Sequence, residues 1–406
     1  MQDNEKKPAL RFKGFTDPWE QRKISELAEK TYGGGTPTTS NETFWNGNIP
    51  WIQSSDIVDG KLMGVEPRKY ITQTGLNSSA TQLVPKNSIA IITRVGVGKL
   101  AYMPFSYSTS QDFLSLSKLN TEPFFTVYAC YKKLQSELNT VQGTSIKGIT
   151  KDELLAKTIS VPVYSEQKQI GSFFAQLDTL ITLHQRKYEK LVNIKKSMLN
   201  KMFPQNGASV PEIRFKDFTD PWEQRKLGDV ADIVGGGTPS TNNPNYWDGD
   251  IDWYAPAEIA GQIYFDSSQR KITEQGYENS SAKMLPPGTV LFTSRAGIGK
   301  TAILSKKGCT NQGFQSIVPH NDELDSYFVF SRTDELKQYG ELVGAGSTFV
   351  EVSGKQMAAM NLKMPTTIEE QQTIGRFFKR LDTLITLHQR EHIKSILEVK
   401  RVKRNE

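Results

Sequence analysis

The sequence predicts an α+β protein: two mixed α/β domains built on twisted β-sheets, separated by two long antiparallel helices that form a coiled-coil-like spacer. Most segments of the first half return in the second half at an offset of about 203 residues, and each half closes with a long amphipathic helical pattern. This period exceeds the roughly 20–50 residues of a solenoid unit, so it indicates a duplicated domain-plus-helix module with pseudo-two-fold symmetry. We therefore expect domains at 1–164 and 204–366, each followed by a helix, at 165–203 and 367–406.

Short motifs make the repeat visible. The stretch 11–23 reappears as 214–226 with a single change, Gly14 to Asp217. The other motifs are Gly-Gly-Gly-Thr-Pro at 33–37 and 235–239, Trp-x-Gly-x-Ile-x-Trp at 45–51 and 247–253, Arg-x-Gly-x-Gly-Lys at 94–99 and 295–300, and Gln-x-Phe at 111–113 and 312–314. The helical stretch 170–186 returns almost unchanged as 374–390.

The globular part of each half has the pattern of strands joined by tight turns. Apolar runs such as 88–93 and 289–293 predict strands, because they are rich in aliphatic and β-branched residues and follow turn residues. The glycine triplets at 33–35 and 235–237 mark tight loops. Polar stretches such as 151–156 are candidate helices. Together these patterns predict a mixed domain on a twisted sheet.

The end of each half predicts a long helix with one apolar face. Ser165 and the capping box of Thr367 with Glu370 mark the two helix starts, and Pro204 ends the first helix. At ~1.5 Å per residue, the stretch 166–202 would span roughly 55 Å. The apolar stripes are expected to pack on each other or on a partner, and the matching histidines to fix the register or contact a partner. The residues concerned are Phe173, Leu177, Leu180, His184, Phe377, Leu381, Leu384 and His388.

Length and composition limit the class of protein. A chain of 406 residues is larger than one hydrophobic core usually serves. No apolar run approaches the roughly eighteen residues of a membrane span, and the polar N-terminal residues do not form a secretory signal. Cys130 and Cys309 are too few for a disulfide framework or a cysteine zinc site, which favours the reducing cytoplasm. The net charge of +6 is compatible with nucleic-acid binding but does not demand it.

The sequence shows no catalytic constellation, and we expect no catalytic residue, metal or cofactor in this chain. The Gly-Lys pairs at 98–99 and 299–300 resemble the end of a phosphate loop, but Thr93 and Ser294 stand where such a loop needs its first glycine. The four histidines lack metal-ligand spacing. For the paired tryptophans, core packing is favoured over stacking on a ligand. Asp178 and Asp382 are expected to face solvent or a partner.

In this order and doubled, the motifs resemble those of the specificity subunits of type I restriction–modification systems. The resemblance covers nearly the whole chain. It includes the Gly-Gly-Thr-Pro loop, the Trp-x-Gly-x-Ile-x-Trp and Arg-x-Gly-x-Gly-Lys segments, and the Pro-x-x-x-Glu-Gln helix start at 162–167. The second helix start, at 365–371, is one residue longer than this pattern, so its position does not follow from the motif.

The resemblance implies a DNA-reading subunit without catalytic activity of its own. Each globular domain would be a target-recognition domain for one half of a split, asymmetric site in double-stranded DNA, and the helices would set the unread gap. Two modification subunits would bind the helices and adjoining surfaces and methylate adenine at N6 with S-adenosylmethionine. Restriction and motor subunits, which use ATP and Mg²⁺, would add DNA translocation and cleavage.

Residues shared by the two halves are expected to serve the scaffold, phosphates or partners, and unlike residues to carry the base code. The expected DNA contacts in shared motifs are Arg94, Lys99, Gln111, Arg295, Lys300 and Gln312. Those in unlike stretches are Lys61, Lys147, Gln262, Ser347 and Thr348. Arginine and lysine beside glycines suit phosphate, because the backbone and the cation can both contact it. Ordinary solvated surface is the alternative for each.

Two other functions remain as alternatives. A stand-alone bipartite DNA-binding protein would bind its site tightly without modification subunits. A two-lobed adaptor that binds peptide or sugar through its tryptophans would bind DNA weakly and independently of salt. The doubled order of motifs and helices favours the specificity subunit over both.

Overall fold

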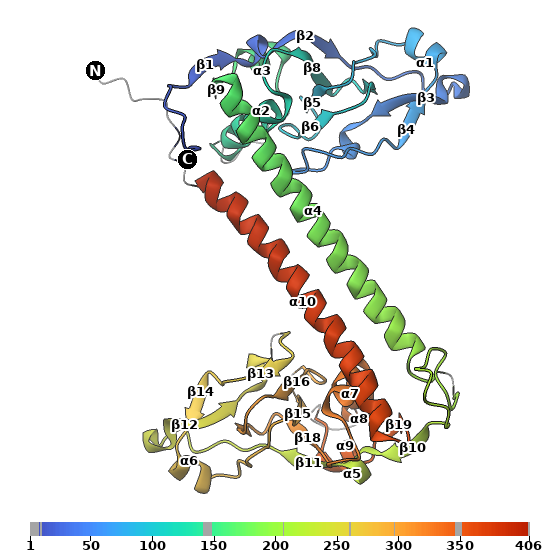
Figure 1. The fold of residues 1–406 in the computed structure, drawn as a ribbon, viewed down its shortest axis with the longest axis vertical. Coiled ribbons are helices and arrows are strands. Elements are labelled where there is room, and N and C mark those ends of the chain that lie inside the picture. Colours follow the sequence, from blue (N-terminus) through green and yellow to red (C-terminus); the bar gives the residue numbers. More distant parts are fainter. Residues whose placement is uncertain are drawn as a thin grey trace. The chain divides into compact units, whose positions relative to one another are not determined.

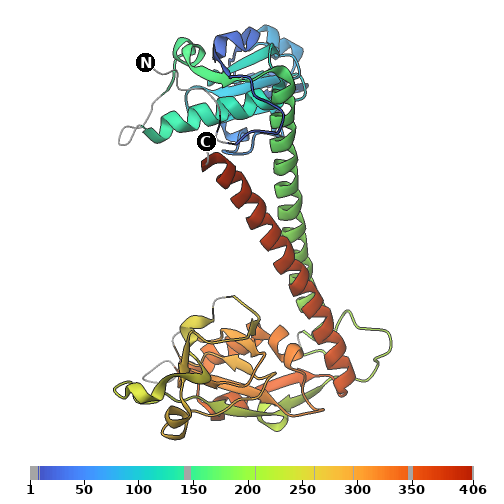
Figure 2. The same ribbon diagram turned by 60° about the vertical axis from the view of Figure 1, so that its left-hand side comes forward.

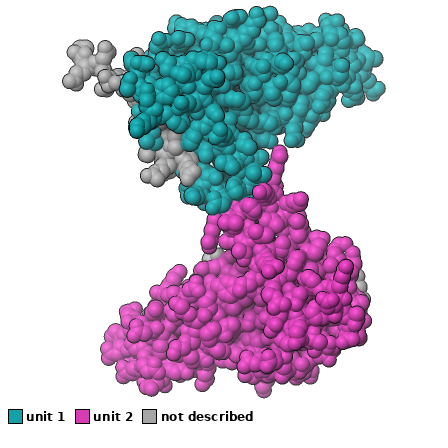
Figure 3. Space-filling view, in the orientation of Figure 1, with its two compact units in different colours: residues 1–184, 391–406 teal, residues 185–390 magenta. Residues whose placement is uncertain are grey.

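The computed structural model of the chain describes residues 8, 10–140, 148–205, 207–259, 261–295, 297–345 and 351–404. The chain divides into two compact units (Figure 3): unit 1 contains residues 1–184 and 391–406, and unit 2 contains residues 185–390. The two long helices are α4 (Tyr164–Lys201) and α10 (Ile368–Arg404). Both units are mixed α/β and repeat nearly the same order of elements (Figure 1), so the predicted fold class is confirmed.

In its described residues, unit 1 contains three small sheets, with strand orders β2-β8-β5-β6, β4-β3-β7 and β1-β9. The strands are β1 (Glu20–Lys23), β2 (Ala28–Gly33), β3 (Trp45–Ile52), β4 (Lys69–Ile71), β5 (Ser88–Ile92), β6 (Leu100–Met103), β7 (Ser108–Thr109), β8 (Phe113–Leu119) and β9 (Thr158–Val161). The helices are α1 (Gln73–Asn77), α2 (Pro123–Thr140) and α3 (Lys151–Ala156), with single 3-10 turns at η1 (Ile24–Glu26), η2 (Glu42–Phe44) and η3 (Ser54–Asp56). Helix α2 packs along β5 and β6 (Figure 2).

Unit 2 repeats this plan, with sheet orders β11-β18-β15-β16-β13, β14-β12-β17 and β10-β19. The strands are β10 (Glu223–Lys226), β11 (Ala231–Gly235), β12 (Trp247–Tyr254), β13 (Tyr264–Phe265), β14 (Arg270–Ile272), β15 (Val290–Phe292), β16 (Thr301–Leu304), β17 (Cys309–Thr310), β18 (Gln315–Pro319) and β19 (Asn361–Met364). The helices are α5 (Leu227–Val230), α6 (Glu274–Glu278), α7 (Ser326–Ser331), α8 (Thr333–Gly344) and α9 (Gly354–Ala358), with 3-10 turns η4 (Pro244–Tyr246) and η5 (Pro256–Glu258).

The central strand β5 explains why the apolar run at 88–93 has no polar alternation. All five of its residues are buried. Ile89 and Ile91 belong to the core cluster that includes the buried residues of α2, whereas Ala90 and Ile92 belong to a second cluster with Ile52 of β3. Successive side chains of a strand point to opposite faces, so a strand covered on both faces needs apolar residues throughout.

The first turn of each long helix is tied to the domain that precedes it. Arg11 donates two hydrogen bonds of 2.7 Å to the carboxylate of Glu166, and Arg214 donates two of 2.7 Å to Glu370. The side chains of Glu166 and Glu370 are 0% and 2% exposed. Each hydrogen-bonded carboxylate raises the pKa of its arginine. The repeated Arg-Phe motif and the Glu-Gln helix start therefore form one joint, which we call the helix root.

A second contact lies further along each helix. The hydroxyl of Tyr128 donates to Asp178 at 2.6 Å, and that of Tyr327 donates to Asp382 at 2.9 Å. Burial raises the pKa of both tyrosines, and the nearby carboxylates raise it further, so both hydroxyls stay protonated donors. The expectation that Asp178 and Asp382 face solvent or a partner is wrong, because each binds its own domain.

Each unit also contains a contact between the two long helices. In unit 2, Lys195 of α4 forms an ion pair of 2.6 Å with Asp382 of α10. In unit 1, Nδ1 of His392 in α10 lies 3.3 Å from the carbonyl oxygen of Ile181 in α4. In unit 2 the C-terminal part of α4 thus contacts the N-terminal part of α10. In unit 1 the N-terminal half of α4 contacts the C-terminal part of α10. This is the antiparallel arrangement that the sequence predicts.

The phenylalanines of the apolar stripe turn toward their own domains. Phe173 meets Phe12 edge-to-face at 5.8 Å between ring centroids, and Phe377 meets Phe215 at 6.2 Å. Both contacts join the helix root, because Phe12 and Phe215 follow the two root arginines in sequence. These residues therefore stabilise the root of each helix.

The leucines of the stripe do not form one continuous seam. Leu177 and Leu381 are buried, whereas Leu180 and Leu384 leave 46% and 42% of their surface exposed. The matching histidines, His184 and His388, are half-buried. Part of the stripe thus serves each domain and part is open surface. A partner role for the open part stays a prediction.

Candidate nucleic-acid interface

The Gly-Gly-Thr-Pro loop follows β2 in unit 1 and β11 in unit 2, and it packs on the turn before β8 in unit 1 and before β18 in unit 2. The amide of Gly35 donates to the carbonyl oxygen of Thr109 at 2.8 Å, and that of Gly237 donates to Thr310 at 2.8 Å. A Cβ atom at Gly34 would lie 1.8 Å from a main-chain carbonyl oxygen of this turn. Only glycine allows so close an approach of two backbone segments.

The shared glutamines lie on that turn. The hydroxyl of Thr36 donates to Oε1 of Gln111 at 2.6 Å, and the hydroxyl of Thr238 donates to Oε1 of Gln312. Both glutamine side chains are exposed. Neither Nε2 atom forms a hydrogen bond with the residues that the structure describes, so each amide presents oriented donors at the surface. The predicted DNA contact of both glutamines stays a prediction that this geometry favours.

The paired tryptophans pack inside the domains. The indole N–H of Trp51 donates to the carbonyl oxygen of Gly35 at 3.0 Å, and that of Trp253 donates to the carbonyl oxygen of Gly237 at 2.8 Å. These two side chains are 4% and 5% exposed. Each meets a second indole edge-to-face at 5.1 Å, Trp45 in unit 1 and Trp247 in unit 2. The inner tryptophans therefore hold the loop in place.

A cation lies over the paired indoles of each unit. Cζ of Arg270 lies 3.7 Å from a ring centroid of Trp247, and Nζ of Lys69 lies 5.8 Å from a ring centroid of Trp45 and 5.8 Å from one of Trp51. The two cations are equivalent, because each stands opposite the inner tryptophan in its β-ladder. Neither was among the predicted contacts. The available signal was a basic residue two positions before the shared Ile-Thr pairs at 71–72 and 272–273.

The Arg-x-Gly-x-Gly-Lys segment forms the turn of the hairpin β5–β6 in unit 1 and of β15–β16 in unit 2. In unit 1 the amide of Thr93 donates to the carbonyl oxygen of Asp112 at 2.7 Å, and in unit 2 Ser294 donates to Gly313 at 2.8 Å. These bonds place the hairpin beside the glutamine turn. A strand follows the lysine, whereas a phosphate loop leads into a helix, so the difference inferred from the sequence holds.

The basic residues of the two hairpins differ in their surroundings. Arg295 forms an ion pair of 2.9 Å with Glu351. The main-chain hydrogen bonds place Gly148 at the corresponding position of unit 1. Arg94 is exposed and makes no ion pair or hydrogen bond with any residue described in the structure. Arg94 is therefore the less neutralised of the two cations. Of the hairpin lysines, Lys99 is half-buried and Lys300 is exposed.

The predicted contacts in unlike stretches fall in two groups. Lys61 and Gln262 are both exposed, and they occupy equivalent positions. Each precedes a residue whose carbonyl oxygen accepts a main-chain hydrogen bond, Leu62 from Tyr102 of β6 at 2.9 Å and Ile263 from Ile303 of β16 at 2.7 Å. Lys147, Ser347 and Thr348 lie outside the described residues.

The hydrogen bonds above join three segments that are distant in sequence. We call them the loop–turn–hairpin surface: residues 34–37, 110–112 and 93–99 in unit 1, and 236–239, 311–313, 293–295 and 297–300 in unit 2. Oriented amides and exposed cations suit a polyanionic ligand. Among the described residues, no three His, Cys, Asp or Glu side chains gather into a possible metal site. No helix in the described ranges is long and apolar enough to cross a bilayer.

The chain matches the family model of the type I restriction modification DNA specificity domain twice, over residues 16–193 and 219–398. The type I restriction enzyme MjaIX specificity subunit of Methanocaldococcus jannaschii is 36% identical over 167 residues, covering 40% of this chain and 38% of that protein. The putative MjaX specificity subunit of the same organism is 23% identical over 393 residues, covering 92% of this chain and 89% of that protein. The crystal structure of a type I S subunit from M. genitalium has the same fold, with a TM-score of 0.65 at 14% identity over 98% of each chain.

Proposed function

Because the chain belongs to the family of type I restriction–modification DNA specificity proteins, we propose that it is the DNA-reading subunit of such a system in the cytoplasm. Each globular domain binds one half of a split, asymmetric site in double-stranded DNA. Two partner modification subunits methylate adenine at N6 with S-adenosylmethionine, and restriction subunits that use ATP and Mg²⁺ translocate and cleave the DNA. This chain contributes recognition and leaves the chemistry to its partners.

The observation that carries the proposal is the loop–turn–hairpin surface, which is built from the same motifs in both units. The stretches beside it, such as 59–70 and 261–271, differ between the units in sequence. Phosphate contacts are the same for every DNA sequence, whereas base contacts are not. A repeated frame with unlike neighbours is what two readers of unlike half-sites require.

A pair of equivalent grooves supports binding of two identical partners. In unit 1 a groove of about 600 Å³ lies along the early turns of α4, and Phe124 and Ser172 line it. In unit 2 a groove of about 410 Å³ lies along the early turns of α10, where Tyr327 and Arg376 take the corresponding places. The exposed Leu180 also lines the first groove. Grooves at matching places along the two helices suit one partner copy on each unit.

The test is co-expression of the full chain with candidate modification subunits, followed by genome-wide mapping of N6-methyladenine. We expect a split motif that appears only with this chain. Its two halves should change separately when residues 1–160 or 207–365 are exchanged for those of a relative. A stable complex with active modification subunits that adds no methylation would refute the proposal, and the stand-alone DNA-binding protein would then be preferred.

A further inference from the structure

Arg270 is held over an indole with its hydrogen-bond donors unused. Its guanidinium carbon lies 3.7 Å from a ring centroid of Trp247, so one face of the planar group is covered. The residue is exposed, and its guanidinium makes no hydrogen bond or ion pair with the described part of the chain. A guanidinium carries five N–H donors at its edges, in a fork that fits two acceptors at once. The stack therefore fixes the plane and leaves the edges free for a ligand.

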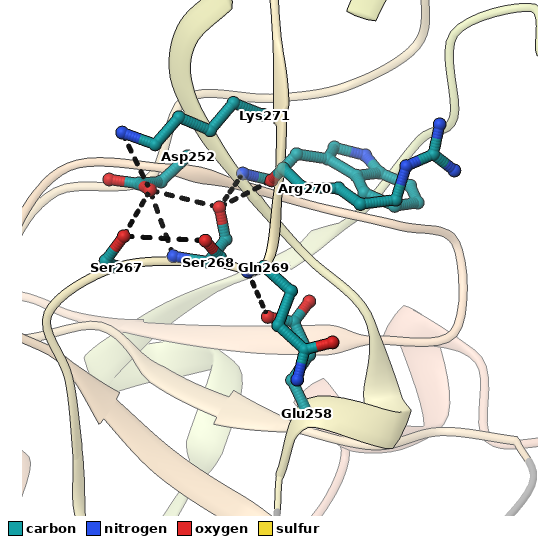
Figure 4. A network of polar contacts seen from close by, with 8 residues as sticks. Asp252, Glu258, Ser267, Ser268, Gln269, Arg270 and Lys271 are labelled. Atoms are coloured by element: carbon teal, nitrogen blue, oxygen red, sulfur yellow. Dashed lines mark hydrogen bonds and ion pairs between the residues drawn. The ribbon is translucent and has the colours of Figure 1, made fainter. Parts of the chain in front are cut away.

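A polar network fixes the backbone on which Arg270 stands (Figure 4). Oδ1 of Asp252 accepts hydrogen bonds of 3.0 Å from the amide and from the hydroxyl of Ser268, and one of 3.4 Å from the hydroxyl of Ser267. Lys271 lies 3.6 Å from the same oxygen. The Asp252 side chain is only 12% exposed. A nearly buried carboxylate thus orders the turn directly before Arg270.

Three further contacts hold the same turn. Oγ of Ser268 lies 2.5 Å from the carbonyl oxygen of Arg270 and accepts a hydrogen bond of 3.0 Å from the amide of Trp253. The amide of Gln269 donates to Glu258 at 2.7 Å. In Figure 4 the Arg270 side chain extends away from this network. The network therefore positions Arg270 without using its charge.

Unit 1 has the same frame with a different cation and different supports. Lys69 stands at the position of Arg270, and Pro50 stands at the position of Asp252. The preceding residue, Arg68, is tied to Asp56 by an ion pair of 2.5 Å. The cation over the tryptophans, Lys69 or Arg270, thus differs between the two domains, and so do the contacts that hold its backbone. The tryptophans themselves are shared.

We propose that Arg270 reads a guanine in the half-site bound by the second domain, and that Asp252 is its positioning residue. This inference rests on the proposed function. A guanidinium fork matches O6 and N7 of guanine in the major groove. The same fork also fits a phosphate, but phosphate contacts carry no sequence information. A phosphate contact therefore gives no reason for the cation, and the contacts that hold it, to differ between two domains that share the same tryptophans. Lys69, a point charge without a fork, selects less sharply in the first half-site.

The experiment uses the full chain co-expressed with its modification subunits and maps the methylated motif. Arg270→Ala is expected to lower the preference for guanine at one position of the second half-site by about 10- to 100-fold, with the first half-site unchanged. Arg270→Lys, which keeps the charge and removes the fork, should relax the same position. Lys69→Ala is the matched control and should alter the first half-site only.

The outcomes separate the possibilities. An unchanged motif in Arg270→Ala refutes the inference. So does uniformly weaker methylation that Arg270→Lys restores, because that pattern identifies a phosphate contact. Asp252→Ala should relax the same single position while Arg270 is present, whereas a merely structural role would lower methylation at all sites alike. Failure of the wild-type chain to produce any split motif refutes the proposed function itself.

Discussion

Removal of Arg214 from the helix root should destabilise unit 2 by about 3–5 kcal/mol, because it leaves the Glu370 carboxylate buried without its cation. The side chain of Glu370 is 2% exposed and accepts two hydrogen bonds of 2.7 Å from Arg214. At about 1.5–3 kcal/mol for each bond to a charged group, the loss comes to about 3–6 kcal/mol, which agrees with the expectation for a broken buried pair. After Arg214→Ala, the donor that remains to this carboxylate among the described residues is the indole of Trp222 at 3.2 Å.

Urea unfolding of the full chain, followed by tryptophan fluorescence, measures this effect. Trp222 is 3% exposed and touches the root, so its emission reports on unit 2. A chain of two units can unfold in more than one step, and each step is fitted separately. Arg214→Ala should shift the step that Trp222 reports. Arg11→Ala, the matched change in unit 1, should shift the other step.

A double variant distinguishes a buried charge from lost packing. Arg214→Leu with Glu370→Leu removes both charges, so it should cost much less than either single change, apart from about 1–3 kcal/mol for the stranded Trp222 indole. A loss below about 1 kcal/mol in Arg214→Ala would refute the reasoning, since that is the range of exposed pairs. A double variant as unstable as the single variants would also count against it.

Three further predictions concern buried or closely packed groups. Burial raises the pKa of Cys130 and Cys309 to about 12, so both thiols should resist iodoacetamide at about pH 8 until the chain unfolds; prompt labelling of the native protein, detected by mass spectrometry, would contradict this. Burial raises the pKa of Asp325, so its charged form destabilises the fold above the folded pKa and the penalty disappears below the unfolded pKa. Relative to the wild type, Asp325→Asn should therefore gain more stability at about pH 7 than at about pH 3; an equal gain at both would rule this out. Gly34→Ala should lower the thermal stability of unit 1, since its Cβ would lie 1.8 Å from a carbonyl oxygen, whereas the neighbouring control Gly33→Ala has no atom within 4 Å; equal melting temperatures would refute the close approach.

The repeat and the apolar patterns predicted the fold class because they depend on local rules. The run at 88–93 reads as a buried strand in any context, and the stripe after residue 165 reads as a helix. Asp178 shows where such rules stop. It was expected to face solvent or a partner, yet Tyr128, fifty residues earlier in the chain, donates a hydrogen bond to it. Only the folded domain brings the two together.

The residues of the candidate site that occur in both domains were predictable from the sequence, whereas those that differ between the domains were not. Gln111 was recognisable because its motif occurs twice, although its partner in the Gly-Gly-Thr-Pro loop was not. Arg270 was missed because its significance comes from Trp247, twenty-three residues away, and from a carboxylate on another strand. Such combinations depend on strand register, which a single sequence does not specify for short strands.

The discontinuity of unit 1 has a consequence for biosynthesis. Unit 2 is one continuous stretch, 185–390, whereas unit 1 combines 1–184 with 391–406. The ribosome therefore synthesises every residue of unit 2 before it reaches residues 391–406, which belong to unit 1. The domain translated first is thus the last to gain all of its contacts, and His392 reaches the carbonyl of Ile181 only after the whole of the other unit has emerged.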